Sequence, residues 1–288
     1  MKLAMVRTGA AEEAAIITDT MAITFGNISG KLGKGWHNDI FAIIESGQLA
    51  EIRRWYQSGG LTGSDFGGME LSEVSFVPPY RSPNKIWCIG LNYREHARDL
   101  EAAVPNLHPT CFMKPGTTII GHGDDIVIPS VSTKTTAEAE LGVVIGKKCK
   151  DVKRESWLDV VAGFVNVIDM TEEDIVRHNP RYVTYAKCFD TFFSFGPCLV
   201  TADEIESISS LAVSTVKNGQ KHASNLVLNM SFPPDYLVSF YSQAMTLLPG
   251  DIISTGTPRA VAITGGDTVE CRITGFPTLA NPVVNQGC

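Results

Sequence analysis

The sequence has no hydrophobic run long enough to cross a bilayer. Its longest apolar stretches, at residues 141–145 and 157–168, are short or interrupted by Asp159 or glycine, whereas a membrane-spanning helix needs about 20 apolar residues. Near the N-terminus, Glu12 and Glu13 stand where a signal peptide would place its apolar segment. We therefore expect an intracellular protein, most simply a cytoplasmic one, with no membrane partner.

Blocks of positive charge and paired cysteines are also missing. The chain has 24 Lys and Arg against 31 Asp and Glu, which gives a formal charge of −7. Nucleic acids and anionic membranes need a positive surface, so we expect no nucleic-acid partner. The seven cysteines are an odd number without a C-x-x-C pair, which fits neither a disulfide framework nor a thiolate metal site. These absences favour a small-molecule enzyme.

The chain does contain enough apolar material for a substantial core, with 44% hydrophobic residues in a length of 288. Short alternating segments near the N-terminus and a helical stretch over residues 38–57 predict a small α/β accessory domain over residues 1–78. The run SFVPPYRSPNK then predicts an extended linker, because its three prolines interrupt regular structure.

Residues 79–288 are predicted to form the larger domain. Strand-like segments such as KIWCIG, ELGVVIGKKC and DTVECRIT are separated by turn signals, and one helix is expected over residues 155–164. Many short strands with few helices favour an α+β fold with a mostly antiparallel β structure.

Three acidic residues in this region predict a metal site. Glu138 and Glu140 are two apart in a strand-like segment, so both side chains point the same way, roughly 7 Å apart. Asp169 follows another apolar segment, where an unpaired carboxylate would be costly to bury. Oxygen ligands without histidine or thiolate select a hard cation, so we expect Mg²⁺ or Mn²⁺. For Glu138 and Glu140, the alternative interpretation is that they are two solvated glutamates at the end of a strand.

A second candidate feature is the segment GLNYREHARD. A helical turn would place His96 and Asp99 on one face, where the carboxylate could orient the imidazole as a general base. An exposed helix with an ordinary histidine and aspartate is the alternative interpretation.

The ordered motifs GLNYREHARD, FMKP, EAELGVVIGKK, VIDMTEED, KCFDTFFSFGP and GDIISTGTP resemble the fumarylacetoacetate hydrolase (FAH) family over residues 80–285. The resemblance implies a mixed β-roll catalytic domain, a homodimer, and Mg²⁺ bound by Glu138, Glu140 and Asp169.

The same resemblance assigns further residues. It implies that Lys187 steadies negative charge on the substrate, that His96 belongs to a lid, and that Asp99 replaces the glutamate usual in this family. Three more residues are candidates for substrate binding beside Thr257 of the TGTP loop: Tyr93, Arg181 and Arg259. The Arg259 guanidinium could bind a second substrate carboxylate, although a solvated surface arginine is the alternative.

These residues together predict chemistry on a 2-oxo or β-diketo acid. Such an acid can chelate Mg²⁺, and the cation with Lys187 would stabilise an enolate formed when a C–C bond breaks. We expect a Mg²⁺-dependent hydrolase of the acylpyruvate or fumarylpyruvate type. The alternatives are a decarboxylase of a β-keto acid such as oxaloacetate, another lyase or isomerase of the family, and a non-catalytic binding protein that retains the fold.

Overall fold

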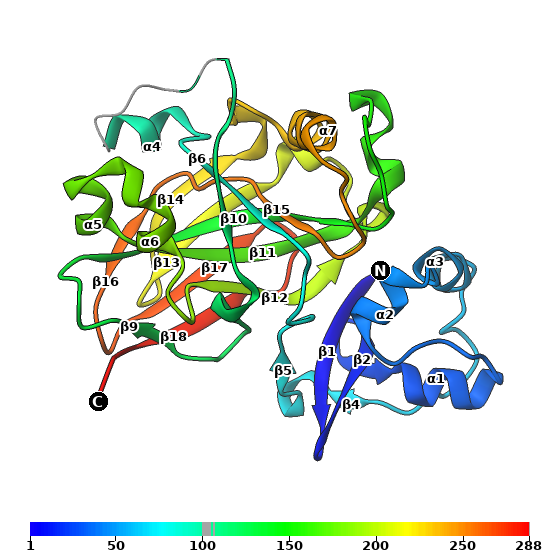
Figure 1. Cartoon of the computed structure of the whole chain (residues 1–288). Helices are drawn as coiled ribbons and strands as arrows, with labels where there is room; N and C mark the ends of the chain where they lie inside the picture. Colours follow the sequence, from blue (N-terminus) through cyan, green and yellow to red (C-terminus); the bar gives the residue numbers. More distant parts are fainter. Residues whose placement is uncertain (100–104, 106, 288) are drawn as a thin grey trace.

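Two β-sheets of mostly antiparallel strands form the body of the protein (Figure 1). The computed structural model describes residues 1–99, 105 and 107–287, without the side chains of Ala97 and Asp99. One sheet has 13 strands and the other has five. Short helices lie around the sheets, so the α+β class predicted from the sequence is confirmed.

The N-terminal region is a three-stranded meander covered by helices. Its elements are β1 (Lys2–Thr8), β2 (Ala11–Ile17), β3 (Met21–Thr24), α1 (Phe25–Leu32), α2 (Ile40–Glu45), α3 (Leu49–Gln57), β4 (Met69–Glu70) and β5 (Phe76–Val77). The side chains of Thr24 and Asp39 cap α1 and α2 by accepting backbone hydrogen bonds. The helical stretch predicted over residues 38–57 is two helices, separated at Gly47, whose φ of 76° suits glycine.

Strand β1 joins this region to the rest of the protein. It pairs with β2 on one side and, on the other, with β12 (Phe193–Val200) of the large sheet. In Figure 1 the blue N-terminal strands accordingly lie beside the end of that sheet. An accessory domain that ends near residue 78 remains a prediction.

The centre of the large sheet is a long hairpin of β10 and β11. Besides β10 (Thr135–Ile145), β11 (Val161–Glu172) and β12, this part of the sheet contains β6 (Ile86–Gly90), β7 (Thr110–Lys114), β8 (Ile119–Ile120), β15 (Ile252–Ser254) and β16 (Val261–Ile263). The helix expected over residues 155–164 is wrong, because only a 3₁₀ helix (Arg154–Val160) forms there before β11 begins. Pairing with β10 buries Phe164 and overrides the local helical pattern.

The five-stranded sheet packs against one face of this hairpin. It consists of β9 (Ile126–Ile128), β13 (Ala212–Lys217), β14 (Gln220–Leu226), β17 (Thr268–Ile273) and β18 (Leu279–Asn285). Ala139, Leu141 and Val143 of β10 belong to the core between the two sheets. Because side chains alternate along a strand, Glu138 and Glu140 point to the opposite face.

The α-helices in the described part of the larger region are α4 (Arg94–Asp99), α5 (Glu173–His178), α6 (Val183–Lys187) and α7 (Pro234–Ala244). The 3₁₀ helices besides the one at Arg154–Val160 are Leu71–Glu73, Gly116–Thr118, Pro180–Tyr182, Ala202–Glu204, Ile208–Ser210 and Val227–Asn229. Among the residues described, no helix combines the length and the apolar character that crossing a membrane requires.

Candidate metal centre and its cavity

The hairpin of β10 and β11 brings three carboxylates together. Glu138 stands directly opposite Asp169 in the strand register, and Glu140 is two residues further along β10 on the same face. One carboxylate oxygen from each residue lies within 4.8 Å of the other two. All three are buried, with exposures of 8% for Glu138, 1% for Glu140 and 0% for Asp169. All three lie inside strands. The alternative interpretation of Glu138 and Glu140, as solvated glutamates at the end of a strand, is therefore wrong.

Two buried lysines offset part of this negative charge. Lys187 Nζ, at the end of α6, lies 3.1 Å from Glu138 Oε2 and 2.7 Å from Asp169 Oδ2. Lys114 Nζ, at the end of β7, lies 2.5 Å from Asp169 Oδ1. Burial disfavours the charged form of Lys187, but the carboxylates of Asp169 and Glu138 outweigh it and raise the pKa of the ammonium.

Glu140 has a different environment. Its Oε2 accepts hydrogen bonds from Ser254 Oγ at 2.5 Å and from the backbone N–H of Gly256 at 2.8 Å. Burial, followed by the charges of Asp169 and Glu138, raises the pKa of Glu140 to about 8. Gly256 has a φ of 94°, and a Cβ there would lie 2.8 Å from Asn92 Cβ, so a larger residue could not present this N–H without strain.

This arrangement fits a hard divalent cation. The donors are carboxylate oxygens, which Mg²⁺ and Mn²⁺ prefer over the nitrogen and sulfur ligands typical of zinc sites. Three carboxylates with only two ammonium groups also leave negative charge buried. The pKa of Glu140 is raised first by burial and then by the charges of the other two carboxylates. A divalent cation would remove the excess negative charge.

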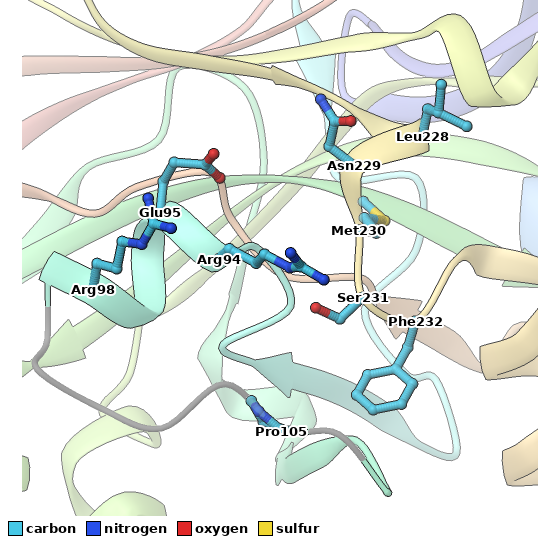
Figure 2. Close-up of a pocket in the computed structure, with 9 residues that line it drawn as sticks. All are labelled: Arg94, Glu95, Arg98, Pro105, Leu228, Asn229, Met230, Ser231 and Phe232. Carbon is cyan, nitrogen blue, oxygen red and sulfur yellow. The ribbon is translucent and has the colours of Figure 1, made fainter.

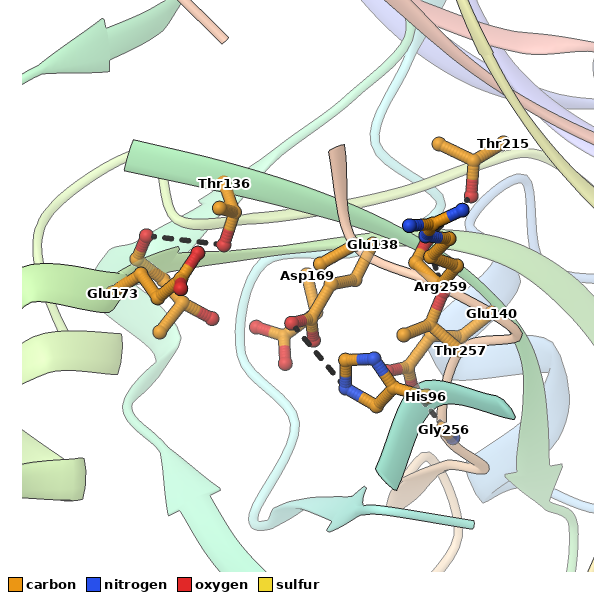
Figure 3. Close-up of polar contacts among 12 residues, drawn as sticks. His96, Thr136, Glu138, Glu140, Asp169, Glu173, Thr215, Gly256, Thr257 and Arg259 are labelled. Carbon is orange, nitrogen blue, oxygen red and sulfur yellow. Dashed lines mark hydrogen bonds and ion pairs between the residues drawn. The ribbon is translucent and has the colours of Figure 1, made fainter. Parts of the chain in front are cut away.

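The helix α4 places His96 over this cluster. His96 is buried, and its Nε2 lies 4.0 Å from Glu138 Oε1 (Figure 3). The neighbouring Glu95 points elsewhere, because it accepts a hydrogen bond from Asn225. Asp99 is the last residue of α4, but its side chain lies outside the described part of the chain. A contact between His96 and Asp99 therefore remains a prediction.

A cavity of about 180 Å³ adjoins His96, and Arg259 is also in its lining. Thr257 is buried just before Arg259 and donates a hydrogen bond to its carbonyl at 3.3 Å. Tyr93 is fully buried, and burial, then the charge of Glu140, raises the pKa of its phenol. Arg181 is exposed in the 3₁₀ helix Pro180–Tyr182 and is not among the residues that line this cavity.

A larger pocket, of about 920 Å³, lies along α4 (Figure 2). Arg94 and Arg98 line it together with Met230 and Phe232. None of the three clustered carboxylates lines this pocket or the smaller cavity. His96, which faces Glu138, lines the smaller cavity and not the larger pocket, so the smaller cavity is the one that adjoins the carboxylate cluster.

Residues 85–284 match the family described as fumarylacetoacetate (FAA) hydrolase, C-terminal. The chain belongs to this family. The match covers the strands and loops that carry every residue of the carboxylate cluster and both lysines.

Members of the FAH family with different names resemble this chain. A mitochondrial oxaloacetate tautomerase from Rattus norvegicus is 37% identical over 221 residues, which cover 74% of this chain and 70% of that protein. The structure of maleylpyruvate hydrolase from Sphingobium sp. SYK-6, in complex with manganese(II) and pyruvate, is 27% identical with a TM-score of 0.80 over 99% of each chain. A 5-carboxymethyl-2-hydroxymuconate delta-isomerase from Mycobacterium smegmatis is 28% identical, with a TM-score of 0.77 over the whole of both chains.

Sequence reasoning gave no role to Lys114 or Asn92, both of which the structure places at this FAH-family site. In β7, Phe112 and Lys114 are the buried positions, and this alternation is a signal that could have predicted a paired lysine. Asn92 donates to the carbonyls of Phe232 and Thr255 and accepts from the N–H of Phe232. It thereby ties the segment before α4 to the loop that contains Gly256.

Metal binding is expected to strengthen as pH rises towards about 8. Because the pKa of Glu140 is raised to about 8, the folded metal-free protein carries a proton that the cation must displace. The affinity for Mn²⁺ should rise by up to about tenfold per pH unit below that value and then level off. Titrations followed by the Mn²⁺ electron paramagnetic resonance signal at about pH 6 to 9 would measure this.

The raised pKa of Glu140 should also make the metal-free protein less stable as the pH rises. Glu140 binds its proton more tightly in the folded state, where its pKa is about 8, than in the unfolded state, where it is 4.5. The free energy of unfolding should therefore fall as pH rises between these two values. A Mn²⁺ affinity that does not change with pH would contradict this description of Glu140.

Proposed function

We propose that this protein is a Mg²⁺- or Mn²⁺-dependent enzyme that interconverts the keto and enol forms of a 2-oxo acid. The observation that supports it best is the buried cluster of Glu138, Glu140 and Asp169 with the Lys187 ammonium 2.7 Å from Asp169. The 37% identity to a protein named oxaloacetate tautomerase favours this chemistry and makes oxaloacetate the first substrate to test.

Each group at the site has a part in such a reaction. When bound, a divalent cation polarises the keto oxygen of a chelating 2-oxo acid and so acidifies the neighbouring C–H bond. The carboxylates would hold that cation, while the Lys187 ammonium would stabilise negative charge that develops on the substrate oxygen. His96, whose Nε2 faces Glu138 at 4.0 Å, would take the proton from carbon or return it.

Hydrolysis of a C–C bond in a β-diketo acid is the second candidate. It needs the same charge stabilisation and, in addition, a water molecule that His96 activates for attack on a distal carbonyl. The likeness to maleylpyruvate hydrolase, at 27% identity over 99% of both chains, supports it. Decarboxylation of a β-keto acid, other lyase or isomerase reactions, and a non-catalytic binding role remain alternatives. A homodimer also remains a prediction.

The two candidate reactions differ in their products. Oxaloacetate prepared in its enol form should lose its ultraviolet absorbance faster with protein and Mg²⁺, without release of CO₂. Acetylpyruvate should undergo proton exchange at carbon in D₂O, followed by NMR, but should not yield acetate and pyruvate. A chelator should stop both reactions. Acetate from acetylpyruvate would favour the hydrolase, pyruvate with CO₂ from oxaloacetate would favour the decarboxylase, and inertness towards both compounds would refute the tautomerase.

A further inference from the structure

Strands β6 and β15 end side by side next to the carboxylate cluster. They pair in parallel, with Cys88 opposite Ser254, so the segments that follow them leave the sheet at the same end. The segment after β6 leads into α4, which carries His96. The segment after β15 contains Gly256, whose N–H bonds to Glu140 (Figure 3). Contacts that fix one segment to the other therefore also fix His96 relative to Glu140.

Asn92 makes this connection with its whole carboxamide. It is 1% exposed, and its Nδ2 donates to the carbonyl of Thr255 at 2.7 Å and to that of Phe232 at 2.9 Å. Its Oδ1 accepts from the N–H of Phe232, and its own carbonyl accepts from the N–H of Ser231, both at 2.8 Å. Thr255 directly precedes Gly256. One side chain thus joins three segments that are distant in the sequence.

The backbone beside Asn92 is strained, which indicates that these contacts impose its position. Leu91 has a φ of 58°, in the left-handed region that residues other than glycine rarely adopt. Such conformations persist only where the surrounding structure holds them, and they are frequent at functional sites. On the other segment, a Cβ at Gly256 would lie 2.8 Å from the Cβ of Asn92. The two segments are therefore in close contact as well as hydrogen-bonded.

The segments that Asn92 joins hold groups with different tasks at the site. On one side, α4 begins two residues after Asn92 and places the buried His96 with its Nε2 4.0 Å from Glu138. On the other, the Gly256 N–H donates to Glu140 at 2.8 Å. A hydrogen bond from outside the ligand set orients a carboxylate for its cation. A shift of either segment would therefore change the geometry of the metal ligands, of His96 or of both.

We propose that Asn92 is a positioning residue that fixes His96 over the carboxylate cluster and directs the Gly256 N–H at Glu140. The effect on catalysis rests on the proposed function, whereas the effects on metal affinity and on the position of His96 do not. Loss of a group that orients a metal ligand typically costs about 10- to 100-fold in affinity or activity. Because Asn92 acts through the backbone of Thr255 and Gly256, the low end of that range is expected.

Asn92→Ala removes the three side-chain hydrogen bonds of Asn92, and Asn281→Ala is its matched control. Asn281 is fully buried in β18, where its Nδ2 donates to the carbonyls of Gly121 and Asp124 and its Oδ1 accepts from Ser194. It makes as many bonds, but none to the segments after β6 and β15. Both variants should lose stability to urea, and only Asn92→Ala should change the site.

Two measurements on the site need no turnover. The affinity for Mn²⁺, followed by its electron paramagnetic resonance signal, should fall about 10-fold in Asn92→Ala. Modification of His96 by diethyl pyrocarbonate, followed by peptide mass spectrometry without metal, should become several-fold faster, because a buried imidazole is exposed when α4 moves. Neither property should change in Asn281→Ala. Asn92→Ser, whose hydroxyl donates only one hydrogen bond, should be intermediate, and it replaces the alanine variant if that variant does not fold.

With oxaloacetate and saturating Mn²⁺, Asn92→Ala should lower kcat with little change in KM, because His96 is displaced while the substrate still binds. In a His96→Ala background the same substitution should lower kcat much less. Unchanged Mn²⁺ affinity or His96 reactivity, the same changes in Asn281→Ala, or an equal loss of kcat in both backgrounds would overturn the inference. If affinity and reactivity change as expected but oxaloacetate is not turned over, the positioning role stands and the proposed function fails.

Discussion

Replacing Glu140 by glutamine should lower the rate of enolisation by about 10³-fold or more, because the cation loses a charged ligand and the substrate loses its charge stabilisation. The glutamine keeps the size of the original side chain and an oxygen that can accept from Ser254 and Gly256. The fold should therefore survive. Mn²⁺ affinity should fall by more than about 100-fold, a larger effect than the loss of a residue outside the ligand sphere.

This variant also distinguishes an effect on metal binding from an effect on the stability of the fold. Removing one of three clustered carboxylates relieves repulsion, so metal-free Glu140→Gln should be at least as stable as wild type at about pH 8 in urea unfolding. Glu155→Gln makes the same chemical change at an exposed position and should alter neither property. Full activity or unchanged Mn²⁺ affinity in Glu140→Gln would refute a metal site at this cluster.

Replacing Lys114 by methionine should destabilise the metal-free protein by about 3 kcal/mol, because it removes one partner from a buried ion pair. The Lys114 ammonium contacts Asp169 Oδ1 at 2.5 Å and the carbonyls of Phe192 and Met170 at 2.5 and 3.0 Å. Lys187 still pairs with the other oxygen of Asp169, so the loss should lie at the low end of the range for such pairs. Urea unfolding measures it.

Mg²⁺ should restore much of the stability that Lys114→Met loses. A cation bound beside Asp169 supplies the missing positive charge, so saturating Mg²⁺ should raise the unfolding midpoint more in the variant than in wild type. Lys148→Met, at an exposed position, should respond to Mg²⁺ as wild type does. Equal loss of stability with and without Mg²⁺ would show that Lys114 acts through packing and not through the charge of Asp169.

Most of the fold class could be predicted from local patterns, while helix boundaries could not. The short segments near the N-terminus did become the strands β1, β2 and β3, but only β3 alternates, because β1 and β2 each bury four consecutive residues. The start of β11 depends on a partner strand, β10, about 20 residues earlier in the chain. The helix expected over residues 155–164 failed for that reason.

The sequence by itself determined which residues have side chains that can act as metal ligands. Glu138 and Glu140 share a face because strand side chains alternate, and the order of the motifs identified the family. Only the tertiary structure decided that Asp169 stands opposite Glu138, that Lys114 and Lys187 both reach Asp169, and that Arg259 shares a cavity with His96. Register, burial and charge pairing join residues that are distant in the chain, and these contacts set the pKa of Glu140.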